Sequence, residues 1–349
     1  MNYALIGCGR ISSNHIKAAM ENGLEISALC DINETIIDNL INLNGLDISR
    51  IKKYTNHKEM LEKENLDLIS IAAKSGLHAL IALDCIDAGV NIIVEKPLAL
   101  SLEEADEIIR RSEKMNVKVC CCHQNRFNPS VQNVYKAMSE GKFGLLSHGT
   151  VHVRWNRNED YYKQASWRGT WAEDGGTLMN QCIHSIDIFR WMMGSEIDEV
   201  FAYTKNQFHD FIETEDLALA VVKFKNGAIG TIEGTVNVYP SNLEETLFIF
   251  GQTGTAKLGG KSLNAIDIWK FEDEKFVANG LSDTKHSGHT AVFKDMKDAI
   301  ENNRAPYIEA KAGRDALELI LAIHKSSKEC RAIKLPLSNG KSKDFKDMF

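Results

Sequence analysis

Apolar and polar positions along the first 122 residues form blocks that predict strands and helices in turn. Runs rich in Val, Ile, Leu and Ala predict buried strands at 3–9, 24–31, 66–73, 91–97 and 117–122. Longer stretches between them predict helices at 12–23, 34–45, 76–89 and 101–116. Strands that are apolar on both faces and separated by helices predict a parallel sheet that is covered on both sides. The fold class expected for residues 1–122 is therefore α/β, a doubly wound sheet of the Rossmann type.

The pattern changes after residue 123. Strand-like runs follow one another at 144–155, 198–208, 215–227, 228–239 and 245–254. Glycine and Asn-Gly pairs separate them, which favours antiparallel pairing. Helical stretches are expected at 182–194, 289–303 and 313–329. We therefore predict a second, α+β domain over 123–336 and a polar tail over 337–349.

Composition narrows the class of protein. A length of 349 residues fits two domains, and 44% hydrophobic with 26% charged residues is typical of a globular protein in water. The net charge of −7 argues against a nucleic-acid partner, because nucleic acids are bound by basic surfaces. No apolar run reaches the roughly 20 residues of a membrane helix, and the first strand leaves no room for a signal peptide. We expect a cytoplasmic protein with no membrane partner.

Eight cysteines are present, three of them contiguous at Cys120, Cys121 and Cys122. Neighbouring residues of a strand point to opposite faces, so these thiols cannot bind one metal ion together. Because no second pair stands at zinc-site spacing, the sequence predicts no metal site and cysteines that fill the core.

A dinucleotide site is predicted at the first turn. Gly7-Cys8-Gly9-Arg10-Ile11-Ser12 has the form GxGxxG with serine in the third position. It follows the first strand, opens a helix, and is followed about twenty residues later by Asp31 at the end of the second strand. Gly7 makes the turn and Gly9 lets a pyrophosphate approach the backbone. The Asp31 carboxylate favours ribose hydroxyls over a 2′-phosphate, so the predicted cofactor is NAD.

The strand at 91–97 ends on Glu95, Lys96 and Pro97. Ligands of a doubly wound sheet bind beyond the carboxyl ends of its strands, so we expect Lys96 to project towards the nicotinamide. There it can hydrogen-bond a substrate hydroxyl and help to move its proton. The alternative is an ordinary surface lysine at a strand end.

A second group of polar residues lies in "DGGTLMNQCIHSIDIFRW", residues 174–191. Asn180 and His184 stand four residues apart, on one face of the expected helix. Histidine is suited to remove a proton from an alcohol near neutral pH. The alternative is a core histidine that is hydrogen-bonded to the backbone. The spacing of these residues is too weak a signal to predict a metal site.

These motifs resemble those of the Gfo/Idh/MocA oxidoreductase family over nearly the whole chain. The resemblance rests on the glycine turn, "EKP", "QNRFNP", the pattern GG-L-NQ--H--D---W and "LELILAIHKSS". It implies catalytic roles for Lys96 and His184 and a second domain with an open, largely antiparallel sheet that builds homodimers or homotetramers. It also implies a set of cofactor contacts: Gly7, Gly9, Arg10, Ile11, Asp31, Ser75, His78, Glu95 at the nicotinamide ribose, Lys96 and Gln124.

Many members of the family carry aspartate four residues before the histidine, where this chain has Asn180. An amide can position a hydroxyl but cannot take its proton, so His184 is the expected base and Asn180 a positioning catalytic group. Within the family the chain is most similar to WlbA-type enzymes, which oxidise UDP-N-acetylglucosaminuronic acid at C3. "EDYYKQASWRGTWAEDGG", "MNQCIH" and "YPSNLEETLFIFGQTGTAKLGG" carry this likeness.

The segment "VRWNRNEDYYKQASWRGTW", residues 153–171, suits such a substrate. Arginine and lysine can bind diphosphate or carboxylate, and aromatic rings can stack on a sugar or a base. Besides Arg157 and Lys163, the predicted substrate contacts are Arg154, Tyr161, Trp167, Arg168, Gln181 and Tyr239. The predicted function is NAD-dependent oxidation of a sugar hydroxyl, C3 of a UDP-sugar. The alternatives are a dehydrogenase of a free sugar or inositol and an NAD-using glycoside hydrolase of the same fold.

Overall fold

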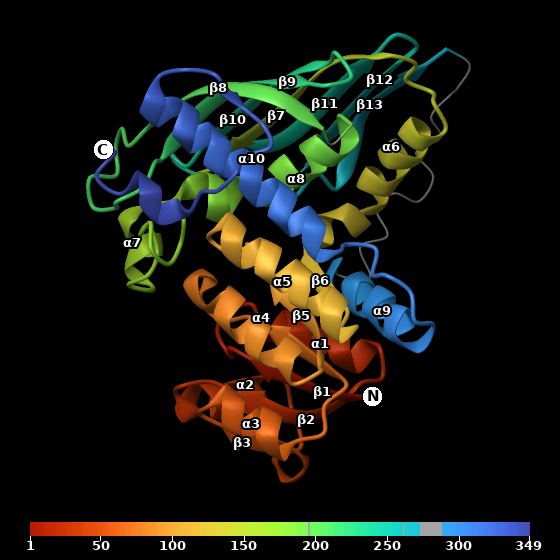
Figure 1. Ribbon diagram of the computed structural model, residues 1–349, viewed down its shortest axis with the longest axis vertical. Coiled ribbons are helices and arrows are strands. Elements are labelled where there is room, and N and C mark those ends of the chain that lie inside the picture. Colours follow the sequence, from red (N-terminus) through yellow and green to blue (C-terminus); the bar gives the residue numbers. More distant parts are fainter. Residues whose placement is uncertain (195, 261, 273–287) are drawn as a thin grey trace. The chain divides into compact units, whose positions relative to one another are not determined.

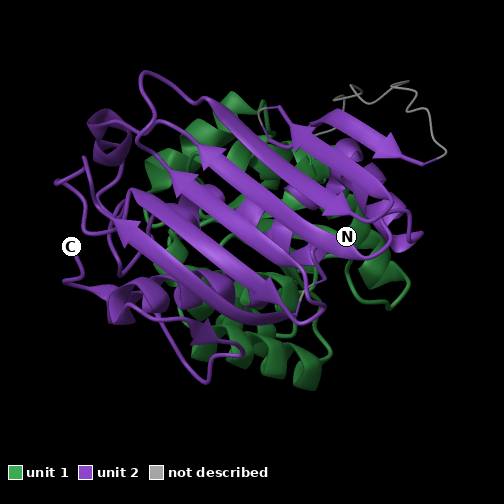
Figure 2. Cartoon of the chain, turned by 90° about the horizontal axis from the view of Figure 1, so that it is seen from above, with its two compact units in different colours: residues 1–124, 284–314 green, residues 125–283, 315–349 purple. Residues whose placement is uncertain are grey.

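The computed structural model describes residues 1–194, 196–260, 262–272 and 288–349, and the chain divides into two compact units (Figure 2). The first unit comprises 1–124 with 284–314, and the second comprises 125–283 with 315–349. The prediction of one continuous second domain over 123–336 is therefore wrong, because the chain returns to the first unit. The tail is also not a separate segment, since Ser342 and Phe345 are buried.

The first unit contains a parallel sheet in the order β3-β2-β1-β4-β5-β6. This order is that of the dinucleotide-binding Rossmann fold, and it confirms the predicted fold class. Strand order reverses at β1, so the ends of β1 and β4 flank the usual ligand position. The strands are β1 (Asn2–Ile6), β2 (Glu25–Cys30), β3 (Lys52–Tyr54), β4 (Leu68–Ile71), β5 (Asn91–Glu95) and β6 (Val119–Cys122).

Helices cover this sheet on both faces, and α1 packs against α9 while α4 packs against α5 (Figure 1). Every residue of β4 and β6 is buried, as expected for strands between two helical layers. Seven of the eight cysteines are buried, and Cys330 is exposed. The helices are α1 (Ser12–Glu21), α2 (Glu34–Leu43), α3 (His57–Lys63), α4 (His78–Asp87), α5 (Leu102–Met115) and α9 (Gly288–Glu301), with short turns η1 (Ile48–Arg50) and η2 (Ser75–Leu77).

The second unit contains a broad sheet in the order β13-β12-β11-β7-β10-β9-β8-β14 (Figure 2). Among the described strands, β7 and β10 pair in parallel and the other neighbours pair antiparallel. The expected open, largely antiparallel sheet is confirmed. Its strands are β7 (Leu146–Arg154), β8 (Ile197–Lys205), β9 (Leu217–Phe224), β10 (Ile229–Thr235), β11 (Glu244–Gly251), β12 (Gly254–Gly259), β13 (Ala265–Phe271) and β14 (Ile333–Lys334).

The two faces of this second sheet differ. α8 (Ile183–Met192) packs on one face. A Cβ on Gly230 would lie only 2.2 Å from the ring of Phe189 in this helix, so only glycine allows such close packing. The other face carries exposed apolar side chains, with Leu219 and Val221 each 50% exposed. Besides α10 (Ala310–Glu329), the remaining elements are η3 (Gln124–Phe127), α6 (Pro129–Ser139), α7 (Glu159–Lys163), η4 (Leu178–Cys182) and η5 (Ser342–Phe345). In the described part of the chain, no helix is both long and apolar enough to cross a membrane.

Candidate active site

The glycine turn of the first unit has the form that a dinucleotide requires. Gly7 has φ +92°, and a Cβ there would lie 2.5 Å from the backbone of Ala72, so only glycine fits. A Cβ at Gly9 would meet nothing within 4 Å, which leaves the backbone approachable. No side chain caps the first turn of α1 at Ile11, and of its amides those of Ser12 and Asn14 donate to the Gly9 and Ile11 carbonyls. These features fit the pyrophosphate of NAD.

Asp31 ties the end of β2 to this turn. One carboxylate oxygen accepts the Cys8 N–H at 2.9 Å and the other accepts the Asn33 N–H at 3.0 Å. Each oxygen retains a lone pair for a ribose hydroxyl. Lys53, on the neighbouring strand β3, is paired with Glu34 at 2.9 Å and Asp38 at 3.0 Å. The nearby ammonium is thus neutralised by protein carboxylates, in agreement with NAD as the cofactor.

The ends of β4 and β5 are joined by a histidine. His78 is buried, with Nδ1 2.7 Å from the Pro97 carbonyl and Nε2 2.9 Å from the Ala73 carbonyl. Burial lowers the pKa of this imidazole. The peptide bond between Lys96 and Pro97 is cis, and Ser75 lies buried at the start of η2. His78 therefore holds the backbone on which Lys96 is mounted, and its predicted contact with the cofactor stays a prediction.

Glu95 has two protein neighbours, and its predicted contact with the nicotinamide ribose stays a prediction. Its Oε1 lies 2.9 Å from His15 Nε2 and 3.1 Å from His289 Nε2, and all three side chains are buried. Burial alone raises the pKa of Glu95, but the two histidine hydrogen bonds outweigh it and hold the pKa well below its usual value. Burial lowers the pKa of His15. These three side chains could form a metal-ligand set, but their spacings are those of hydrogen bonds.

In the second unit, the predicted catalytic pair occupies an unusual position. Between residues 174 and 189, every side chain is buried except Asn180 and His184. Asn180 lies in η4, a π-helical turn that the sequence did not predict, and His184 lies in α8. Such turns occur frequently at functional sites. The fold thus leaves these two side chains partly exposed in an otherwise buried segment.

The entry to η4 is held by a buried carboxylate. Glu215 Oε1 accepts the Leu178 N–H at 2.8 Å. Gly176 has φ +101°, and a Cβ there would lie 2.2 Å from Glu215 Oε2. The entry to η4 is therefore tightly fitted.

Asp174 is a functional candidate that the sequence reasoning missed. The Asn180 side-chain amide donates a hydrogen bond to Asp174 Oδ1, and Asp174 Oδ2 accepts the Gly169 N–H at 2.8 Å. Asp174 is 3% exposed. This hydrogen bond fixes the orientation of the Asn180 amide. It also places the Asp174 carboxylate beside position 180, where many related proteins carry aspartate.

Two buried acids anchor α8 in the turn that follows His184. Asp187 accepts two hydrogen bonds of 2.6 Å from Arg126 of the "QNRFNP" motif. Ser185 donates a hydrogen bond to Glu245, whose pKa burial raises to about 7. Both contacts limit movement of the helix that carries His184.

Four of the six predicted substrate contacts gather beside η4. Gln181 donates a hydrogen bond of 2.7 Å to the Tyr161 hydroxyl and accepts one of 2.9 Å from Arg157. The guanidinium of Arg168 lies 4.1 Å from the centre of the Tyr161 ring and 5.5 Å from that of Trp167. This cluster of Arg157, Tyr161, Trp167, Arg168 and Gln181 is called the Tyr161 cluster below.

Arg154 is not part of the Tyr161 cluster. It lies at the end of β7 on the sheet face away from α8, paired with Glu233 and Glu244. These carboxylates already neutralise it, so its contacts do not support the predicted substrate role. Tyr239, the remaining predicted contact, is 91% exposed.

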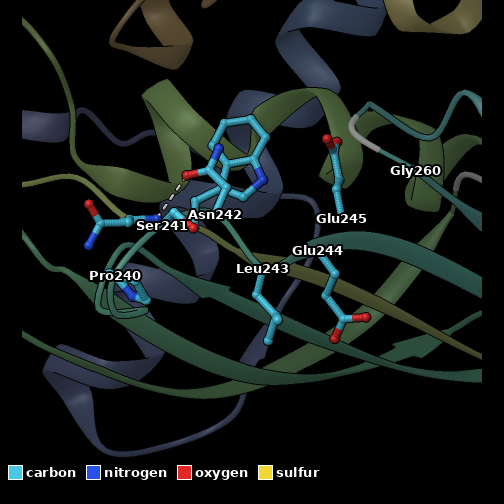
Figure 3. A pocket seen from close by; sticks show the side chains of 9 residues that line it. Pro240, Ser241, Asn242, Leu243, Glu244, Glu245 and Gly260 are labelled. Carbon is cyan, nitrogen blue, oxygen red and sulfur yellow. Dashed lines mark hydrogen bonds between the residues drawn. The ribbon is translucent and has the colours of Figure 1, made fainter.

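A cavity of 540 Å³ lies at the start of β11 (Figure 3). Figure 3 shows Glu244 and Glu245 pointing to opposite sides of the strand. Asn242 accepts hydrogen bonds from the Asn156 backbone and from Arg157, which connects the cavity to the Tyr161 cluster. The lining residues are Trp155, Asn156, Pro240, Ser241, Asn242, Leu243, Glu244, Glu245 and Gly260.

Comparison with known proteins agrees with both units. Residues 1–123 match the model of an oxidoreductase family with an NAD-binding Rossmann fold, and residues 131–257 match that of the GFO/IDH/MocA C-terminal domain. The chain belongs to the Gfo/Idh/MocA oxidoreductase family. Membership establishes an NAD-binding oxidoreductase, and the cofactor predicted from Asp31 is confirmed.

Solved structures of this family include close counterparts of the chain. The WlbA dehydrogenase of Bordetella pertussis, in complex with NADH and UDP-GlcNAcA, is 33% identical with a TM-score of 0.88, over 97% of this chain and 99% of the other. The WlbA dehydrogenase of Chromobacterium violaceum, with the same ligands, is 31% identical with a TM-score of 0.90, over 97% and 96%. The myo-inositol 2-dehydrogenase of Thermotoga maritima is 24% identical, over 96% of this chain and 98% of the relative.

Proposed function

We propose that this protein oxidises a ring hydroxyl of a sugar nucleotide with NAD, at C3 of a UDP-sugar such as UDP-GlcNAcA. The observation that carries the proposal is the selective exposure of Asn180 and His184 beside the guanidinium and aromatic groups of the Tyr161 cluster. Such groups suit a substrate that is anionic and contains rings. The likeness to the WlbA dehydrogenases over 97% of the chain supports the same substrate class.

In the proposed mechanism, His184 removes the proton of the hydroxyl as general base. The Asn180 amide, oriented by Asp174, positions that hydroxyl. Lys96 is assigned the stabilisation of the negative charge that develops on the substrate oxygen. Bound NAD supplies the acceptor for the hydride from the carbinol carbon. The role of Lys96 comes from its family motif and its place after β5.

The test is formation of NADH, followed by absorbance, with a matched set of substrates. The proposal expects oxidation of UDP-GlcNAcA in preference to free N-acetylglucosamine, free glucuronic acid and myo-inositol. Faster oxidation of myo-inositol would support the second candidate, a polyol dehydrogenase, which the relative from Thermotoga maritima favours. Release of free sugar from a glycoside without net NADH would instead identify a hydrolase.

Replacement of Lys96 tests its catalytic role. Lys96→Ala should lower turnover by at least about a hundredfold, as loss of a proton-transferring or charge-stabilising group does. NADH binding, followed by fluorescence, should stay within about twofold, and Lys17→Ala on the exposed face of α1 provides the control. Turnover equal to that of the wild type would refute the assignment.

We further propose that the open face of the second sheet joins copies of the chain into a homodimer or homotetramer. Its exposed apolar residues support this proposal: Tyr203, Leu219, Val221 and Ile229. The expected cytoplasmic location stays a prediction.

A further inference from the structure

The four basic residues predicted to bind substrate differ in how far ion pairs and hydrogen bonds within the protein already occupy their side chains. Arg154 is paired with Glu233 and Glu244, and Lys163 is paired with Glu159 at 2.9 Å on the surface of α7. Arg157 hydrogen-bonds to the side chains of Gln181, in the Tyr161 cluster, and Asn242, in the cavity wall. Their hydrogen-bonding capacity is thus at least partly used within the protein.

Arg168 differs from these three. Its Nε and Nη1 atoms are buried, and among the described residues neither has a hydrogen-bond partner. Stacking on Tyr161 and Trp167 holds the guanidinium by its face. Burying donors of a charged group without acceptors costs free energy, and an anion beside the accessible part of the guanidinium offsets that cost electrostatically.

A second guanidinium strengthens the local positive field. Arg157 lies 5.0 Å from the centre of the same Tyr161 ring and 4.8 Å from that of Trp155. Two like charges beside one ring repel each other, and an anion bound there relieves that repulsion. The site therefore favours an oxyanion over a neutral ligand.

The location connects this charge to the catalytic helix. The Tyr161 hydroxyl is bonded to Gln181, which lies next to Asn180 and three residues before His184. A ligand held at Arg168 is therefore held by the same unit, and through the same short chain of contacts, as the proposed base.

We infer that Arg168 is an oxyanion-binding subsite that takes a carboxylate or phosphate of the substrate, and this inference rests on the proposed function. A guanidinium binds either group through two parallel N–H···O bonds. Arg168 thus sets substrate class, because a neutral sugar leaves the charge of its guanidinium without a counter-charge.

Calorimetric binding to the NADH-loaded protein tests the inference and identifies the anion. The ligands are UDP-GlcNAcA, UDP-GlcNAc, UDP and free N-acetylglucosaminuronic acid, and the variants are Arg168→Gln, Arg168→Lys and Lys136→Gln. Arg168→Gln should weaken binding at least tenfold and Arg168→Lys less, since lysine keeps the charge but not the bidentate geometry. Lys136→Gln removes the same charge from an exposed position of α6 and should bind within twofold of the wild type.

The pattern of losses separates the two sources. If Arg168→Gln weakens the binding of UDP-GlcNAcA and the free uronate alone, the anion is the carboxylate. If it weakens the binding of all three UDP ligands, the anion is the diphosphate. Folding of each variant is checked by its melting temperature. Unchanged binding in a folded Arg168→Gln protein, an equal loss in Lys136→Gln, or no binding of these ligands to the wild type overturns the inference. Selective losses without NADH formation would leave the subsite standing and reject the proposed reaction.

Discussion

At the scale of single residues, the contact between Asp174 and Asn180 changes how the proposed mechanism is read. An amide replaces the carboxylate that many related proteins carry at position 180, yet a carboxylate lies against it, supplied from six residues earlier. The negative charge is therefore supplied by Asp174 and is not missing from the site. The sequence at position 180 alone indicates only that the carboxylate is absent there.

Restoring aspartate at position 180 should be harmful. In Asn180→Asp two carboxylates would meet, and like charges at that distance cannot both ionise near neutral pH. We expect kcat to fall at least about tenfold at pH 8, with the loss smaller at low pH, where the pair shares a proton. Steady-state kinetics over pH 6–9 provide the measurement.

The swapped double variant Asp174→Asn/Asn180→Asp is the control, because it restores one amide and one carboxylate. It should recover most of the lost turnover. Full activity of Asn180→Asp alone over the whole pH range would show that Asp174 does not act on residue 180.

Glu245 should make stability depend on pH. Its pKa is raised to about 7 by burial, so the folded state binds a proton that the unfolded state releases near pH 4.5. Stability that this group contributes at low pH is lost as pH rises from about 4.5 to 7, in total roughly 3 kcal/mol. Urea unfolding at pH 5 and pH 8 should show a larger decrease for the wild type than for Glu245→Gln. Buried His15 and His78 titrate in both proteins, so identical decreases would contradict the assignment.

At the scale of elements, η4 is set by contacts that no local pattern predicts. The expected α-helix begins as a π-helical turn because the Leu178 amide is bound by Glu215 and the chain passes Gly176 without room for a side chain. This geometry brings Asn180 and His184 to the surface of an otherwise buried segment.

Gly176→Ala tests this fit against a matched glycine. Gly176 and Gly227 both have positive φ, at +101° and +91°, but only at Gly176 would the new Cβ meet other atoms. Both variants carry backbone strain, and Gly176→Ala adds overpacking against Glu215, so it should lose about 1–3 kcal/mol more stability than Gly227→Ala. Chemical denaturation of both variants measures the difference, and equal losses would argue against a tight entry to η4.

At the scale of the whole molecule, the open face of the second sheet is the surface through which copies of the chain are expected to associate. Leu219 and Val221 are neighbouring outward positions of β9, each half exposed. Leu219→Lys/Val221→Lys would place two charges in the proposed interface at little cost to the buried face of the strand.

We expect this double variant to be monomeric where the wild type is a dimer or tetramer, measured by light scattering after size exclusion. Leu43→Lys, at an exposed position of α2 in the first unit, is the control. A monomeric wild type, or a variant with unchanged mass, would remove the proposed interface.

Much of the fold follows from local patterns. The apolar runs that predicted β1, β2, β4, β5 and β6 are long enough to be recognised, and Gly7, Gly9 and Asp31 stand at spacings with a direct steric or electrostatic reason. β3 has three residues, too few for a periodicity. The return of the chain to the first unit at 284–314 was also missed, because a helix pattern does not say which sheet it packs against.

The sequence by itself determined the type of domain, the cofactor turn and the chemical nature of Lys96, Asn180 and His184, because each depends on near neighbours in the chain. Only the tertiary structure decided which charges are already satisfied. Glu95 is held by histidines 80 and 194 residues away, Arg154 is neutralised by carboxylates of two other strands, and Arg168 keeps buried donors without a partner among the described residues. Hydrogen bonds and ion pairs act over a few ångströms, and those distances are set by packing between segments that lie far apart in the sequence.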